Sequence, residues 1–95
     1  MSRRVLPLSW TGDIAQAKAR LRQAVLAAGD ATFVVEEDAY WHIEFRSRIF
    51  QFVDDVEFLF DPANKLVHVR SASRLGRSDF GVNRKRVEKI RTFFR

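Results

Sequence analysis

The chain has 95 residues, with 17 Lys/Arg against 12 Asp/Glu and a net charge of +5. This length is typical of one domain, so we predict a single domain over residues 1–95. Because there is no cysteine, disulfides and thiolate metal sites are excluded. No apolar run approaches the roughly 18–20 residues of a membrane span, and Met1–Arg4 precedes no signal-peptide core. We therefore expect a cytoplasmic protein.

Positive charge is concentrated towards the C-terminal end of the chain. Residues 70–95 hold nine Lys/Arg against two acids, whereas residues 1–69 hold eight against ten. This asymmetry is consistent with an anionic partner, either a small molecule or a protein. It is also typical of a solvated basic helix face, and both interpretations stay open.

The N-terminal third predicts a strand followed by a helix. Val5–Trp10 alternates loosely and predicts a short edge strand. Asp13 is suited to cap a helix, apolar residues then recur at helical spacing, and Gly29 is a suitable stop. We therefore predict a helix over residues 13–28.

Strand patterns dominate the middle of the chain. The predicted strands are Thr32–Glu36, Tyr40–Ser47, Phe50–Phe60 and Leu66–Ser71, and a second helix runs from Asn83 to the end. Short connections make neighbouring strands antiparallel. The order β-α-β-β-β-β-α predicts an α+β fold: a two-layer sandwich in which an antiparallel sheet of about four to five strands packs against two helices.

Asp54 raises the question of what balances an inward carboxylate. It shares its strand parity with Phe52, Val56 and Phe58, which we expect to point into the core, whereas Asp55 falls on the wet face. A buried carboxylate is costly unless it is paired. We predict that Asp54, or Asp55 if a bulge shifts the register, clamps an arginine of the following segment. The candidate arginines are Arg70 and Arg74.

The segment RSASRLGRSDFGVNRKR, residues 70–86, also resembles the material of an anion site. Arginines supply charge, serines donate hydroxyls, glycines widen the backbone choices, and a helix begins near Asn83. No phosphate-loop spacing is present. The residues that form either the clamp or the anion site are Asp54, Asp55, Arg70, Ser71, Ser73, Arg74, Ser78, Asp79, Asn83 and Arg84. Asp79 is also suited to cap a helix or form a turn.

We predict no catalytic residue, metal ion or cofactor. His42 and His68 fall on the wet face beside Glu44, Asp55 and other charged residues. Such a group is either a fragment of a metal or acid/base site or, more commonly, a cross-strand charge ladder. No serine has the setting of a nucleophile elbow.

Nucleic-acid binding is an alternative for the final helix. It carries Arg84, Lys85, Arg86, Lys89, Arg91 and Arg95, which could meet phosphates. No helix-turn-helix pair or zinc finger is visible, and the aromatic residues fall at core positions. We therefore do not expect a nucleic-acid partner.

Two stretches of the chain resemble the domain of unknown function 1499 (DUF1499) family of bacteria and plant plastids: FVDDVEF at 52–58 and VRSASRLGRSDFGVNRKRVEKIR at 69–91. The patterns PLSW-GD at 7–13 and Y-H-E-RS-IF at 40–50 agree with it. The resemblance implies no established activity. Its hallmark positions correspond here to Asp54, Asp55, Arg70, Ser71, Ser73, Arg74, Gly76, Ser78, Asp79, Gly81, Asn83 and Arg84. The upstream cysteine and the export sequence of many members are not seen in this sequence.

Together these patterns favour a non-catalytic binding or structural module. Its Arg/Ser/Asp/Asn segment is expected to form an internal clamp and an anion-binding surface. The alternatives are an enzyme with an Asp/Arg cleft and a nucleic-acid binder that uses the C-terminal helix.

Overall fold

The computed structural model describes residues 5–46, 52–74 and 80–94, and only the backbone of residues 80–82. Its elements are β1 (Leu8–Ser9), α1 (Ile14–Ala28), β2 (Ala31–Glu36), β3 (Tyr40–Arg46), β4 (Val53–Asp61), β5 (Leu66–Ser73) and α2 (Phe80–Phe94). The strands form one antiparallel sheet in the order β1-β5-β4-β3-β2. The predicted α+β fold and its element order are confirmed.

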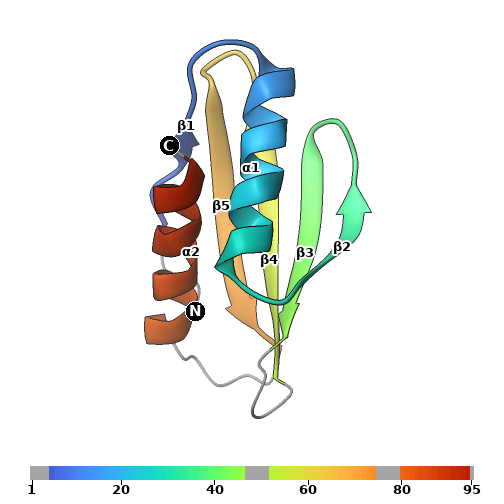
Figure 1. The fold of residues 1–95 in the computed structure, drawn as a ribbon, viewed down its shortest axis with the longest axis vertical. Helices are drawn as coiled ribbons and strands as arrows, with labels where there is room; N and C mark the ends of the chain where they lie inside the picture. The colour runs from blue at the N-terminus through green and yellow to red at the C-terminus, as the bar shows by residue number, and fades with distance from the viewer. Residues whose placement is uncertain (1–4, 47–51, 75–79, 95) are drawn as a thin grey trace.

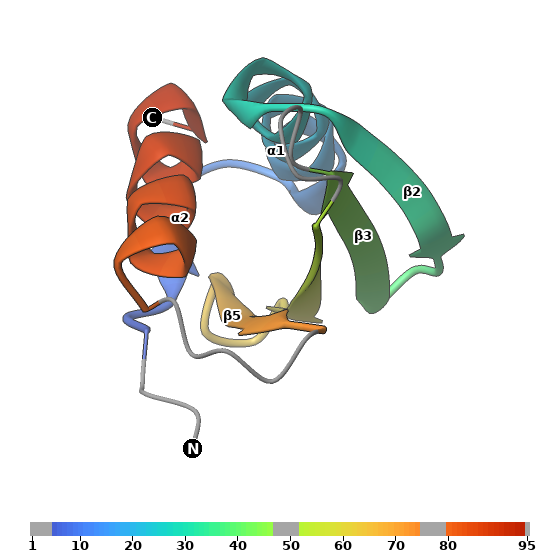
Figure 2. The same cartoon turned by 90° about the horizontal axis from the view of Figure 1, so that it is seen from below.

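The two helices form a second layer on one face of the sheet (Figure 1). Seen from below, the sheet curves around this helical layer (Figure 2). We call the helix-facing side of the sheet the inner face and the opposite side the outer face. No helix of the described residues covers the outer face, so its side chains are left to solvent or to a partner.

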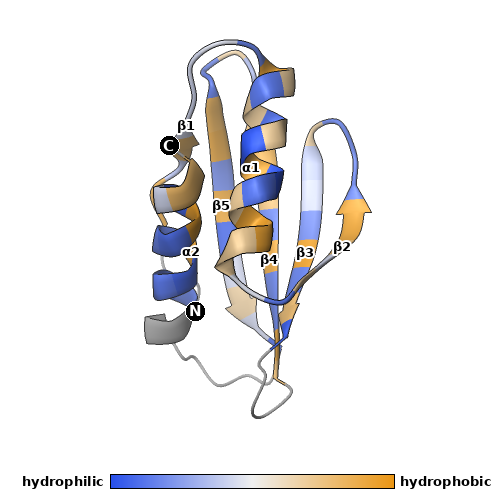
Figure 3. Ribbon diagram, viewed as in Figure 1, coloured by the Kyte–Doolittle hydropathy of each residue, from blue (hydrophilic) through white to orange (hydrophobic). Residues whose placement is uncertain are grey.

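The hydrophobic core lies between the inner face and the helices. Apolar and polar residues alternate along β3 and β4 (Figure 3), as expected for strands with one buried face. Trp41 packs edge-to-face against Phe33 and Phe60, with ring centroids 5.7 and 5.1 Å apart. The other buried residues of this core include Ile43, Phe45, Val56, Phe58, Val67, Leu21, Val25 and Ile90.

Helix α1 begins as predicted. Gly12 adopts a positive φ of 84°, which glycine tolerates better than other residues. The Asp13 side chain then accepts a hydrogen bond of 2.8 Å from the backbone N–H of Gln16, satisfying one of the free N–H groups of the first turn. Ala17 and Leu21 of this helix are buried in the core.

Several boundaries differ from the sequence prediction. β1 is reduced to Leu8–Ser9, which pairs with the start of β5, instead of extending over Val5–Trp10. β5 continues to Ser73, two residues beyond the prediction, and α2 begins at Phe80, three residues early. The start of the segment 70–86, which we call the Arg/Ser segment, therefore lies on a strand. The strand decides which way each of its first side chains points.

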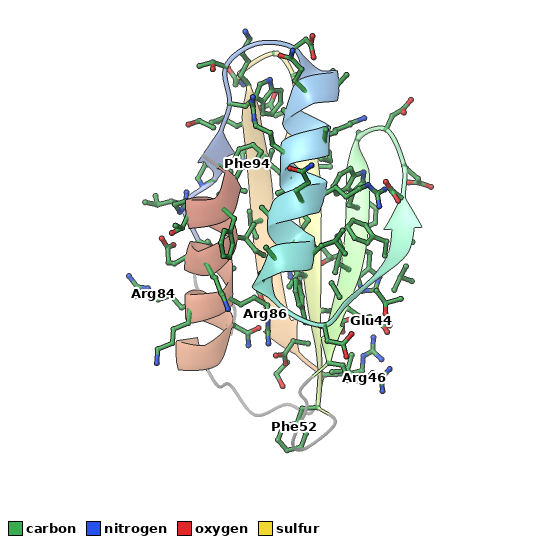
Figure 4. All side chains as sticks on the ribbon, in the orientation of Figure 1. Glu44, Arg46, Phe52, Arg84, Arg86 and Phe94 are labelled. Atoms are coloured by element: carbon green, nitrogen blue, oxygen red, sulfur yellow. The ribbon has the colours of Figure 1, made fainter. Side chains whose placement is uncertain are left out.

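The prediction that Phe52 points inward is wrong, because its side chain lies at the surface with 38% of the residue exposed. β4 begins only at Val53, so Phe52 precedes the strand, and Figure 4 shows it at the lower end of the molecule. The predicted strand start at Phe50 lies outside the described residues.

Candidate functional site

Strand alternation divides the Arg/Ser segment between the two faces of the sheet. In the β4–β5 register, Ser73 lies opposite Asp54 and Ser71 lies opposite Val56, on the inner face. Arg70 lies opposite Glu57 on the outer face, and Arg74, two positions beyond Ala72, reaches carboxylates on that same side. The backbone N–H of Arg74 donates a hydrogen bond of 3.1 Å to the carbonyl oxygen of Val53, so the chain remains beside β4 at this residue. The segment therefore contributes to two clusters, one on each face.

The inner cluster consists of Asp54, Ser71, Asn83 and Arg86. Arg86 Nη1 donates to Asp54 Oδ2 at 2.7 Å and lies 3.5 Å from Asn83 Oδ1. Ser71 Oγ donates to the same amide oxygen at 2.5 Å. Asp54 and Asn83 are the two buried polar residues of the described chain. The cluster therefore ties α2 to the lower ends of β4 and β5.

The surroundings of Arg86 strengthen this attachment. Its guanidinium carbon lies 4.8 Å from the centre of the Phe45 ring, within the range of a cation–π contact. Figure 4 shows Arg86 directed towards the sheet, whereas Arg84 points away from it. The side chains of Asp54 and Arg86 are only 11% and 14% exposed, so water screens this ion pair poorly.

The partner of Asp54 differs from the prediction. Asp54 does point inward, but it pairs with Arg86 and not with Arg70 or Arg74, because both of these lie on the outer face. The alternative pairing of Asp55 with Arg74 is present, without a bulge in β4. The sequence contained a clue to Arg86. It follows Asn83 by three residues, so on a helix the two side chains lie on the same side, next to the apolar position of Val87.

The outer cluster consists of His42, Glu44, Asp55 and Arg74. Arg74 forms two hydrogen bonds to Asp55, from Nε at 3.1 Å and from Nη2 at 2.7 Å. The same Nη2 donates to Glu44 Oε2 at 2.7 Å. His42 Nε2 lies 2.8 Å from Asp55 Oδ1. The cluster thus spans β3, β4 and the end of β5.

The contacts of the outer cluster favour the charged forms of both Asp55 and Arg74. The hydrogen bonds from Arg74 hold the pKa of Asp55 below its ordinary value, with His42 acting in the same direction and partial burial opposing both. Reciprocally, the hydrogen bonds to Asp55 and then Glu44 raise the pKa of Arg74. A protonated arginine and an ionised aspartate are therefore the resting forms.

The rest of the outer face forms separate cross-strand pairs. Tyr40 donates its phenolic hydrogen to Glu57 Oε2 at 2.5 Å, and this bond is the main reason that the pKa of Tyr40 is raised. Arg70 Nη1 lies 3.8 Å from Glu57, and His68 Nε2 lies 3.6 Å from Asp61. These pairs have the form of a charge ladder.

The two histidines do not meet. His42 lies on β3 and His68 on β5, with β4 between them. His42 contacts Asp55, whereas His68 lies near Asp61. The structure instead brings His42 close to Glu44 and Asp55. One ligand atom of each of these three residues lies within 4.8 Å of the others, an arrangement that could hold a metal ion. Alternation within β3 placed His42 and Glu44 on one face, but their proximity to Asp55 required the strand register.

The described residues of the predicted anion site do not gather in one place. Ser71 and Asn83 bond to each other inside, Arg74 is held by two carboxylates outside, and Arg84 is exposed on α2. Ser73 faces inward opposite Asp54. Ser78, Asp79, Gly76 and Arg77 lie outside the described residues, and no side-chain description covers residue 81.

Two cations predicted for a nucleic-acid face of α2 are engaged internally. Arg86 belongs to the inner cluster. Arg91, expected on the exposed face, has a side chain only 20% exposed. It donates to the backbone oxygens of Leu6 at 2.6 Å and Pro7 at 3.0 Å, and to Glu88 at 3.2 Å. These contacts tie the N-terminal segment to α2 and leave fewer cations for phosphates.

Comparison with known proteins gives one match. The family model described as "Protein of unknown function (DUF1499)" matches residues 1–94. No curated protein and no solved structure matches the chain. Among the described residues, neither helix has both the length and the apolar character needed to span a bilayer.

Proposed function

The chain belongs to the DUF1499 family, described only as of unknown function, and we propose that it is a non-catalytic binding or structural module. The observation that carries this proposal is that two consecutive aspartates hold arginines on opposite faces of the sheet. Asp54 holds Arg86 inside the fold, and Asp55 holds Arg74 on the uncovered face. In this proposal the side chains of residues 70–86 that point to the inner face stabilise the fold, and those that are exposed form a binding surface.

The structural half of the proposal rests on the inner cluster. Its ion pair and hydrogen bonds join residues separated by up to 32 positions and connect both long central strands to α2. A charge pair at this depth has a large cost if one partner is missing. The cluster therefore favours one placement of α2 on the sheet.

The binding half rests on the cations that remain exposed. Besides Arg74, which is held by two carboxylates, these are in the described C-terminal region Arg70, whose side chain is 70% exposed, and three cations of α2: Arg84, Lys85 and Lys89. Arg70 lies on the outer face of β5, and Arg84 lies on α2. Arginine is suited to bind phosphate or carboxylate groups through paired hydrogen bonds. We therefore assign the anionic partner to these exposed cations.

The alternative of an enzyme that uses Asp54 or Asp55 is weakened by the arginine that each carboxylate already holds. A hollow of about 210 Å³ lies between α1 and the β2–β3 connection, lined by Arg22, Glu36 and Trp41 among others, and neither aspartate lines it. Small-molecule sites commonly measure about 300–1,000 Å³. Each aspartate already has a carboxylate oxygen engaged by an arginine.

The test is thermal unfolding with a panel of inorganic phosphate, sulfate, nucleotides and anionic lipid head groups. We expect one of these anions to raise the unfolding midpoint of the wild type, because a ligand of the folded state stabilises it. The double variant Arg70→Gln/Arg84→Gln should lose this shift. Lys65→Gln, a control in the exposed turn between β4 and β5 and outside this set of cations, should keep it.

Two results would contradict the binding half of the proposal. One is a panel in which no anion raises the wild-type midpoint. The other is a shift of equal size in the wild type, the double variant and the control, which would indicate a general salt effect and no site at Arg70 and Arg84.

A further inference from the structure

We propose that His42, Glu44 and Asp55 form a binding site for a divalent transition-metal ion, which enters at the position that the Arg74 guanidinium occupies. This site is separate from the Arg70/Arg84 surface, and its test does not depend on an anionic partner. Three observations carry the inference: the donor set, the position of one arginine nitrogen, and the charge balance.

The strand register brings the three donors together. His42 and Glu44 are two residues apart on β3, so their side chains leave the same face of the sheet. Asp55 lies directly opposite Glu44 on β4. One ligand atom from each lies within 4.8 Å of the others, and His42 Nε2 is only 2.8 Å from Asp55 Oδ1.

A metal ion requires only a small adjustment of these side chains. Donors that are each about 2.1 Å from one ion lie at most about 4.2 Å apart. The His42–Asp55 separation already satisfies this limit, and since all three ligand atoms lie within 4.8 Å of one another, no separation exceeds it by more than a fraction of an ångström. All three side chains are on regular strands, so side-chain rotation alone can close the set.

Arg74 Nη2 marks the position that a cation prefers. It lies 2.7 Å from Glu44 Oε2 and 2.7 Å from Asp55 Oδ1, the oxygen that also contacts His42. The Arg74 side chain is 48% exposed, so it can move into solvent when another cation takes this place. Arg74 and the metal ion are therefore competitors for the same carboxylates.

Charge also favours the exchange. With a neutral imidazole, the two carboxylates of the outer cluster exceed the single charge of Arg74 by one. A divalent ion balances both carboxylates. His42 would then bind through Nε2 with its proton on Nδ1, since a metal ligand must present a lone pair.

The donor chemistry selects the class of metal. One imidazole nitrogen with two carboxylate oxygens suits zinc, manganese or iron(II), whereas magnesium and calcium prefer oxygen donors throughout. Since the sequence has no cysteine, thiolate cannot contribute. We therefore expect zinc to bind and magnesium to bind far more weakly.

The experiment is a calorimetric titration of metal-free protein with Zn²⁺, and with Mg²⁺ for comparison. We expect one equivalent of Zn²⁺ to bind to the wild type. Arg74→Gln should bind it about tenfold more tightly or better, because the competing cation is gone, and His42→Ala about tenfold more weakly or worse. His68→Ala removes the other histidine of the outer face and should leave binding unchanged.

Circular dichroism of each variant verifies that it is folded, and Glu44→Gln replaces His42→Ala if the latter unfolds. The proposal is overturned if neither the wild type nor Arg74→Gln binds Zn²⁺ saturably. It is also overturned if the folded His42→Ala or Glu44→Gln variant binds like the wild type, or if His68→Ala is the variant that loses binding. Each of these results would leave the anion test untouched.

Discussion

Asp54 and Asp55 each hold an arginine at 2.7 Å, but they do so on opposite faces of the sheet and at different depths. The inner pair has side chains 11% and 14% exposed, whereas Asp55 and Arg74 are 27% and 48% exposed. Equal distance therefore does not mean equal energy. A buried pair loses several kcal/mol when one partner is removed, while an exposed pair contributes about 0–1 kcal/mol.

The strongest test of this comparison is to substitute the two neighbouring aspartates one at a time. Asp54→Asn should lower the free energy of unfolding by about 3 kcal/mol, because Arg86 would remain as an uncompensated buried charge. Asp55→Asn should lower it by less than about 1 kcal/mol at neutral pH. Urea denaturation of both variants measures the two losses under the same conditions.

A double variant separates charge from packing. Asp54→Val with Arg86→Met removes both members of the inner pair and keeps much of the volume, so it should recover most of the loss caused by Asp54→Asn. Equal losses for Asp54→Asn and Asp55→Asn would refute the comparison. A double variant as unstable as Asp54→Asn would instead assign the effect to packing around Phe45 and Asn83.

The two clusters also differ in how far they could be predicted from the sequence. Strand alternation was enough to place Asp54 inside and Asp55 outside, since period two needs only local pattern. The identity of each arginine partner was not local. Arg86 meets Asp54 only because α2 packs against the inner face, and Arg74 meets Glu44 across 30 residues because β3, β4 and β5 are neighbours.

The described residues of the predicted anion site lie apart for a related reason. The predicted strand ended at Ser71, which allowed Ser73 and Arg74 to turn back towards Arg70 and Ser71, but β5 continues through Ser73. On a strand, successive side chains must point to opposite faces. The Ser71 side chain therefore bonds to Asn83 on the inner side, and the Arg74 side chain bonds to Asp55 on the outer face.

The acid range sharpens the comparison for the outer cluster. The pKa of Asp55 is lower in the folded protein than its unfolded value of about 3.9. The stability that this shift contributes is present above the unfolded pKa and is lost as pH falls through the folded pKa. Urea midpoints measured from neutral to strongly acidic pH should therefore fall less steeply in Asp55→Asn than in the wild type.

A matched variant on the same face serves as the control. Arg70→Gln removes an arginine that lies 3.8 Å from Glu57 and does not contact Asp55. It should keep the wild-type acid slope, whereas Arg74→Gln should reduce the slope as Asp55→Asn does. An Asp55→Asn curve parallel to that of the wild type would show that the outer cluster contributes nothing to acid stability.

The smallest expected effect belongs to Tyr40, on the same face but outside both clusters. Its hydrogen bond to Glu57, followed by burial and nearby carboxylates, raises the pKa of the phenol above its usual value of about 10. Stability from this bond is therefore complete below the unfolded pKa and is lost as pH rises through the folded pKa. Because Tyr40 is the sole tyrosine, phenolate absorbance reports on it directly. Its titration should move to lower pH in Glu57→Gln and stay in place in Asp61→Asn; no movement in Glu57→Gln would mean that this short outer bond is not kept in solution.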